Sequence, residues 1–305
     1  MLHQYIYKPS DAGLDAWPSG ELRLEGIEIT EDASKADVFV LPGNLRIFEK
    51  SSGVLDIDRL NRLPHFKGNE SKFVAFDVSD NFTQPVNLPI IFIRCDVRTW
   101  MLPHDPNTIQ MAWPVEDYSE CIDLPEGGFK YDVSFQGWLS SDARILSVNS
   151  CKENSRLTCD LAEYSDFSGY RKPEDPEYTR RRAEFRRSMK ESRIALCGES
   201  IPGVLPYRFF EAMSAGRVPL LVGSNYVLPM ADLIPYDEFI LRCETANASD
   251  AGRIIEKYVG MFSDAMIRET GLEGRRYWEK YLDSRKWPQL MAYAVQKKLG
   301  VLQSA

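Results

Sequence analysis

Short apolar runs bounded by turn residues alternate along the chain with stretches of helical periodicity. In the first half, four apolar runs have the length of buried strands, at residues 2–7, 38–41, 73–76 and 90–93. In the second half, similar runs occur at residues 132–135, 194–197, 218–222 and 239–241. This alternation predicts parallel sheets that are covered by helices, the α/β class.

Helical periodicity falls between these strands. A helix is predicted near residues 143–150, and another is predicted after Ser249, a candidate N-cap, where apolar residues recur at helical spacing. The chain closes with two aromatic helical stretches, around residues 277–281 and 287–295.

The segment 101–130 breaks this rhythm and predicts a domain boundary. It contains four prolines and a Gly127-Gly128 pair, which are typical of irregular connections. We therefore predict an N-terminal domain at 1–125, a C-terminal domain at 126–285 and a closing helix at 286–305. A length of 305 residues agrees with two domains, and a cleft between them is the expected ligand site.

Composition narrows the class of protein further. The chain is 44% hydrophobic and 27% charged, as in ordinary globular proteins, and its net charge of -8 argues against a nucleic-acid partner. Six scattered cysteines without a CxxC pair indicate reduced thiols, and three isolated histidines argue against a zinc site. The N-terminus does not resemble a signal peptide, and no apolar run approaches the roughly 20 residues of a membrane span. We expect a cytoplasmic protein without an integral membrane segment, either a trimmed form or a bacterial or viral enzyme.

The segment from residue 194 to residue 229 carries most of the chemistry. A strand is followed by a loop with Gly198 and Gly203, and then by a helix at 207–215 that Gly216 ends. Such a loop brings backbone N–H groups and the positive end of a helix close to phosphate oxygens. Arg208 adds a permanent cation, and Glu211, one helical turn later, can accept hydrogen bonds from the two hydroxyls of a ribose. The alternative is a surface ion pair between Arg208 and Glu211, with the glycines serving only as turn residues.

The same residues resemble the exostosin family of glycosyltransferases. The matching text is YRFFEAMSAGRVP at 207–219 and SNYVLP at 224–229, and the resemblance extends over roughly residues 190 to 262. Fainter matches are VSFQG at 133–137 followed by Arg144, ADVFVLP at 36–42 and FVAFDVSDN at 73–81. In the last of these, Ser79 and Asn81 flank Asp80, where the family often has histidine and tryptophan.

This resemblance implies a fold of the GT-B type, with two Rossmann-like domains that face each other across a cleft. The implied activity is inverting transfer of a sugar from a nucleotide-sugar, by default a UDP-sugar, to a hydroxyl of a glycan acceptor, with no metal and no further cofactor. The expected donor-binding residues are Arg144, Lys190, Gly198, Ser200, Gly203, Arg208, Glu211 and Asn225. Lys190 is included because it precedes the strand at 194 and is expected to approach the donor phosphates.

Inversion requires a base that takes the proton of the acceptor hydroxyl. We assign this role to Asp80, which follows the apolar run at 73–76; the alternative is an ordinary Asp-Asn turn at a strand end. Asp77, Asp105 and His104 are the reserve candidates.

Three competing interpretations remain open. Asp56-Ile57-Asp58 is a DxD sequence of the kind that holds a metal in other glycosyltransferases, although it also fits the start of a helix with acids at its positive end. The basic segment 178–193 is either a helix packed on the second domain or a patch for an anionic acceptor or a peripheral membrane contact. A non-catalytic nucleotide-binding or glycan-binding protein would keep the donor loop and lack a working base.

The assignment of Asp80 predicts that Asp80→Asn leaves the affinity for the donor near normal and depresses turnover, because only proton transfer is lost. Donor binding by calorimetry and turnover with an acceptor measure the two effects separately. Wild-type turnover in the variant would remove Asp80 from the mechanism.

Overall fold

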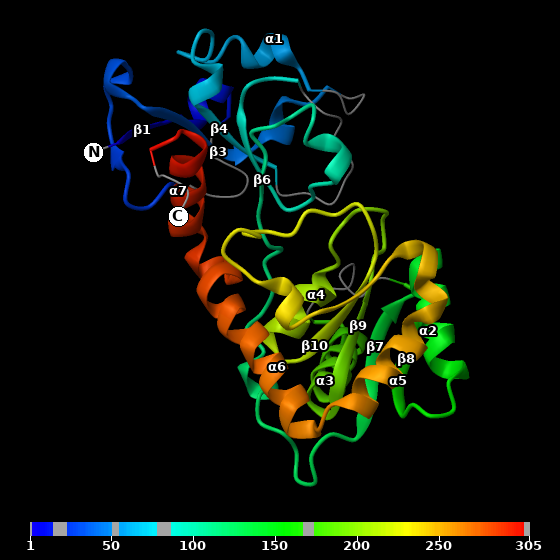
Figure 1. Cartoon of the computed structure of the whole chain (residues 1–305). Coiled ribbons are helices and arrows are strands. Elements are labelled where there is room, and N and C mark those ends of the chain that lie inside the picture. Colours follow the sequence, from blue (N-terminus) through cyan, green and yellow to red (C-terminus); the bar gives the residue numbers. More distant parts are fainter. Residues whose placement is uncertain (1, 15–22, 51–54, 78–86, 167–173, 302–305) are drawn as a thin grey trace. The chain divides into compact units, whose positions relative to one another are not determined.

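The computed structural model describes residues 2–14, 23–50, 55–77, 87–166 and 174–301 (Figure 1). The chain forms two compact units, unit 1 with Met1–Ala112 and Ser284–Ala305, and unit 2 with Trp113–Asp283. The divide at residue 112 falls inside the irregular segment, 13 residues before the predicted position at 125. The closing helix, predicted as a separate segment, groups with unit 1.

Unit 1 contains a sheet of parallel strands in the order β2-β1-β3-β4-β5-β6. The strands are β1 (His3–Ile6), β2 (Glu28–Ile29), β3 (Val38–Asn44), β4 (Phe73–Asp77), β5 (Ile91–Arg94) and β6 (Ile109–Gln110). The four apolar runs of the first half correspond to β1, β3, β4 and β5. The two-residue strands β2 and β6 were not predicted, because so short a segment carries no periodicity.

The crossovers of unit 1 contain little regular helix among the described residues. Among the described residues between β3 and β4, the only α-helix is α1 (Ile57–Leu60), and 3₁₀ and turn structure surround it. Pro64 disfavours helix at the residue before it, and His65 and Gly68 adopt positive φ angles of 62° and 90°. The helix that contacts the sheet from the end of the chain is α7 (Trp287–Lys298), which packs against β5.

Unit 2 contains a parallel sheet in the order β11-β10-β9-β7-β8. Its strands are β7 (Tyr131–Trp138), β8 (Cys159–Tyr164), β9 (Ser192–Gly198), β10 (Val218–Val222) and β11 (Leu241–Cys243). Its helices are α2 (Asp142–Glu153), α3 (Pro176–Glu191), α4 (Tyr207–Ser214), α5 (Ala251–Met261) and α6 (Asp264–Tyr277), with a π-helical turn at Trp278–Leu282. The edge strand β8 was not predicted, since its partly exposed residues mix polar and apolar types without a buried run.

Helices cover both faces of this sheet (Figure 1). Alternate strand residues such as Val133, Ile194 and Leu220 join one core cluster with residues of α2 and α5. The opposite face contacts α3 and α4, and Phe209 and Phe210 of α4 are fully buried. Both units are therefore Rossmann-like parallel α/β structures, which confirms the predicted fold class.

Two further expectations can be compared with the described residues. Each of the six cysteines carries a free thiol, as predicted. None of the helices in the described ranges combines the length and the apolar character that crossing a bilayer requires.

A glycine of α6 lies against the turn that ends α4. Gly216, in the predicted left-handed cap conformation at φ 65°, lies so close that a Cβ on Gly271 would be 2.3 Å from its carbonyl oxygen. A Cβ on Gly260, in α5, would meet open space. Gly271 therefore permits the close packing of α6, and Gly260 does not contribute to packing.

We predict that Gly271→Ala lowers the free energy of unfolding by about 2 to 3 kcal/mol, because backbone has to move apart. Gly260→Ala is the matched control and should raise it by about 0.5 kcal/mol through helix propensity. Urea unfolding of both variants measures the difference. Equal effects of the two substitutions would contradict the close approach of α6 and Gly216.

Candidate functional site

The candidate site lies where the strands of unit 2 end. Because the strands are parallel, the carboxyl ends of β7, β9, β10 and β11 share one edge of the sheet, the edge at which open α/β sheets bind ligands. The loop 199–206 follows β9 at this edge, and the amino ends of α2 and α4 begin there.

Arg144 lies in the first turn of α2, whose N-cap is Ser141. Its Nε donates to the carbonyl oxygen of Gly198 at 2.9 Å, and one NH group donates to the carbonyl of Trp138 at 3.0 Å and to the Ser140 hydroxyl at 3.3 Å. Among the described residues no carboxylate forms an ion pair with Arg144. Burial and the neighbouring Arg208 lower its pKa to about 10, so it remains a cation at neutral pH.

Arg208 lies in the first turn of α4 and is directed toward the end of β7. One NH group donates to the backbone carbonyl of Gln136, and the guanidinium lies 4.4 Å from the ring centre of Phe185. The side chain is 19% exposed, and its Nε contacts a Glu211 carboxylate oxygen at 3.3 Å. Arg144 and Arg208 thus place two cations at one strand edge, held mainly by carbonyls and an aromatic ring.

Glu211 accepts from three donors. Besides Arg208, Arg182 contacts it at 3.3 Å and the Tyr118 hydroxyl donates to it at 3.2 Å. Burial and the charge of Glu211 raise the pKa of Tyr118, which keeps its hydroxyl protonated as a donor. With Glu211 13% exposed, the Arg208–Glu211 pair is largely buried and is not the surface ion pair of the alternative interpretation.

The predicted glycines have separate structural reasons. A Cβ on Gly198 would lie 2.9 Å from Cγ of Arg144, so this position has to be small for Arg144 to reach the strand end. Gly203 has a φ of 81°, in the left-handed region that favours glycine. Ser200 lies in the same loop, and Asn225, exposed and at φ 62°, follows β10 at the same edge.

Two predicted residues do not join this group. Lys190 precedes the amino end of β9, so the seven residues of that strand, about 20 Å, separate it from the donor loop. The structure therefore does not bring Lys190 to Arg208. Asp80 lies outside the described residues and stays a prediction.

The reserve candidates in unit 1 have other surroundings. The buried guanidinium of Arg94 lies between Asp77, at 3.6 Å, and Asp105, at 3.3 Å. His104 is exposed in a turn. Asp77 and Asp105 therefore compensate a buried arginine, a structural role.

The two competing motifs also have structural roles. Asp56 of the DxD sequence caps α1 by accepting from the backbone N–H of Arg59, as the helix-start interpretation predicts. Across the described ranges, no group of three or more His, Cys, Asp or Glu residues is arranged to hold a metal ion. The basic helix α3 packs on unit 2, and its arginines form ion pairs with carboxylates of that unit: Arg180, Arg181, Arg182, Arg186 and Arg187. This local neutralisation does not support the anionic-patch interpretation.

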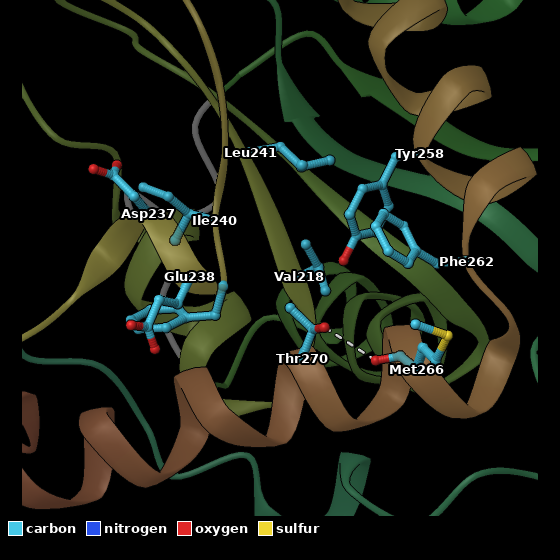
Figure 2. Close-up of a pocket in the computed structure, with 10 residues that line it drawn as sticks. Val218, Asp237, Glu238, Ile240, Leu241, Tyr258, Phe262, Met266 and Thr270 are labelled. Atoms are coloured by element: carbon cyan, nitrogen blue, oxygen red, sulfur yellow. Dashed lines mark hydrogen bonds between the residues drawn. The ribbon is translucent and has the colours of Figure 1, made fainter.

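Unit 2 also contains a pocket of about 310 Å³ (Figure 2). Tyr258 and Phe262 line one side of it, and Ile240 and Leu241 line another. Since Val218 and Leu241 begin β10 and β11, this pocket is at the amino edge of the sheet. It shares no residue with the candidate site.

Sequence reasoning missed Glu199 and Gln136. Glu199 follows Gly198 directly and is buried at the strand end, and Gln136 contributes only its backbone carbonyl to Arg208. The position of Glu199 after an apolar strand was the available signal. The use of a backbone oxygen at position 136 leaves no trace in the sequence.

The chain is similar to proteins described as glycosyltransferases. No family model matches the chain. A probable glycosyltransferase of Arabidopsis thaliana is 26% identical over 133 residues, 42% of this chain, and the match spans a quarter of that relative's length. A glycosyltransferase structure from Rickettsia africae is similar with a TM-score of 0.51 and 10% identity, covering 87% of this chain and 78% of that one. AviGT4, a glycosyltransferase involved in avilamycin A biosynthesis, covers 99% of both chains with a TM-score of 0.44 and 13% identity. The Rickettsia structure supports the Rossmann-like fold.

We predict that Gly198→Ala weakens the binding of a nucleoside diphosphate by about tenfold, because the added methyl displaces Arg144 from the strand end. Gly137→Ala is the matched control, since its Cβ would make only ordinary contacts, at 3.4 Å with Phe135 and at 4.0 Å with the Arg208 guanidinium. Calorimetric titration with UDP, together with thermal melting to confirm folding, measures both. Unchanged affinity in folded Gly198→Ala would remove Arg144 from the site.

Proposed function

We propose that this protein transfers a sugar from a nucleoside diphosphate donor to a hydroxyl group of a glycan. The observation that carries the proposal is the pair of arginines at the carboxyl edge of the unit 2 sheet. Arg144 has only neutral oxygen partners among the described residues, and it lies near a second cation, Arg208. Two like charges placed together are unfavourable without an anion between them, and a diphosphate is an anion of suitable charge and geometry.

The chemistry of glycosyl transfer would use this charge directly. As the bond between the anomeric carbon and the diphosphate breaks, negative charge accumulates on the departing oxygen. Guanidinium groups and backbone N–H groups that are already in place stabilise it without reorganisation. In the proposed mechanism, Arg144, Arg208 and the amino end of α4 supply that stabilisation without a metal ion.

The remaining parts of the mechanism rest on the sequence resemblance. An acceptor hydroxyl oxygen bonds to the anomeric carbon on the face opposite the diphosphate, and the diphosphate leaves, so the configuration at that carbon is inverted. The proton of the hydroxyl passes to a base. We assign the base to Asp80 and the donor to a UDP-sugar on the exostosin pattern, and Glu211 to the hydroxyls of the ribose. The partial match to a probable glycosyltransferase of Arabidopsis thaliana supports the general activity.

A two-stage experiment tests the proposal. Calorimetric titration with UDP, GDP and ADP measures whether the protein binds a nucleoside diphosphate. A hydrolysis and transfer assay then measures whether the matching nucleotide-sugar serves as the sugar donor. If none of the three nucleotides binds, the proposal is contradicted. Binding without turnover on any acceptor favours the non-catalytic alternative.

We predict that Arg208→Ala weakens UDP binding by about 2 to 4 kcal/mol, because a partly buried cation that contacts phosphate is lost. Arg186→Ala makes the same change in net charge on α3, where Arg186 is 46% exposed and pairs with Glu116, and should leave the affinity nearly unchanged. Calorimetry on both variants measures the difference. Similar losses in both would show that only overall charge matters.

A further inference from the structure

A buried carboxylate with no role in the predicted donor site lies beside it. Glu199 directly follows β9 and is only 2% exposed. One of its carboxylate oxygens accepts from the backbone N–H of Gly203 at 2.9 Å and of Ser224 at 3.4 Å, and the other accepts from the Thr245 hydroxyl at 2.5 Å. Through one side chain, the loop after β9 is joined to the residues that follow β10 and β11.

The backbone around Glu199 is shaped to receive this carboxylate. Gly203 lies at φ 81°, and its N–H is directed back to the start of its own loop. A Cβ on Gly223 would lie 2.9 Å from the carboxylate oxygen Oε2, so a side chain there would displace Glu199. The Ser141 hydroxyl, which caps α2, also donates to the backbone carbonyl of Glu199 at 2.5 Å.

The chemical state of Glu199 limits what it can do. Among the described residues, no lysine or arginine forms an ion pair with it, so hydrogen bonds alone compensate the burial of its carboxylate. Removing a carboxylate from water is unfavourable unless hydrogen bonds replace those to water, and the donors around Glu199 supply them. Since both oxygens are occupied by N–H and O–H donors, Glu199 is not placed to take a proton from a substrate.

We propose that Glu199 is a positioning residue for diphosphate binding, an inference that rests on the proposed function. By fixing Gly203, it fixes the course of the loop 199–206, which leads into the first turn of α4 and therefore sets the direction of Arg208 and of the backbone of that turn. The carbonyl of Gly198, the residue directly before Glu199, is the oxygen that Arg144 contacts, so the anchored loop begins next to that contact.

This role predicts an effect opposite to that of simple electrostatics. A carboxylate near a bound diphosphate repels it, so removing the charge alone should strengthen binding. A positioning role requires that removing the charge weakens binding, because a neutral amide oxygen accepts the N–H groups of Gly203 and Ser224 less strongly than a carboxylate oxygen does. The amide NH2 group would also require the Thr245 hydroxyl to accept where it now donates. The sign of the change in affinity therefore separates the two.

The experiment uses Glu199→Gln in the full chain, with Thr245→Val as a second variant and Thr245→Ser as its matched control. Calorimetric titration with UDP and with inorganic pyrophosphate measures affinity, and hydrogen exchange measures protection of the Gly203 amide. We expect Glu199→Gln to bind both ligands about tenfold more weakly, Thr245→Val to lose several-fold, and Thr245→Ser to resemble the wild type. The Gly203 amide should exchange faster in Glu199→Gln and Thr245→Val while the strands remain protected.

Each outcome decides between the alternatives. Unchanged or tighter binding by folded Glu199→Gln overturns the positioning role, as does unchanged exchange at Gly203 with normal affinity in Thr245→Val. If Glu199→Gln does not fold, the comparison of Thr245→Val with Thr245→Ser carries the test. A wild-type protein that binds neither ligand contradicts the proposed function and with it the role in diphosphate binding, whereas accelerated exchange at Gly203 would still show that Glu199 holds the loop.

Discussion

The unit 2 site depends on the repulsion between two guanidinium groups that the chain holds near each other at one strand edge. Among the described residues Arg144 has no ion pair, and the ion pair of Arg208 with Glu211 is only one of its contacts. Backbone carbonyls of Trp138, Gly198 and Gln136 receive their N–H groups, and Phe185 covers one cation. Carbonyls satisfy hydrogen bonds without neutralising charge, so Arg144 keeps its positive charge without a carboxylate partner among the described residues, whereas Arg208 also contacts Glu211.

Parallel strand topology is what makes this arrangement possible. Each strand of unit 2 ends at the same edge, where carbonyl groups and helix amino ends coincide. The close packing of Arg144 against Gly198, and of Glu199 against Gly223, shows that the glycines at this edge provide space for particular side chains. The helices behind the sheet, in contrast, satisfy their own charges, as the ion pairs of α3 show.

Much of the unit 2 fold could be predicted from the sequence. The strand at 218–222 has the predicted bounds, and α4 begins at Tyr207 and ends before Gly216, because each signal there is local: a buried apolar run, a helix start after Pro206 and a left-handed glycine. The edge strand β8 and the irregular crossovers of unit 1 depend on tertiary packing, and their sequences lack periodicity. At the site, Arg208 was predicted from its place at a helix start and Arg144 from the resemblance, and the structure brings both to one strand edge. Glu199 was missed although it directly follows an apolar strand, because its partners Gly203, Ser224 and Thr245 come together only in the fold. Lys190 lies before the amino end of β9, and proximity in sequence to a strand does not indicate which of its ends is near the loop.

The triple coordination of Glu211 has a consequence for any anion that reaches Arg208. If Arg208 turns away from Glu211, Tyr118 and Arg182 still donate to that carboxylate. The loss of Arg208 as a partner therefore leaves no buried carboxylate without a donor. Redundant donors of this kind reduce the cost of separating Arg208 from Glu211.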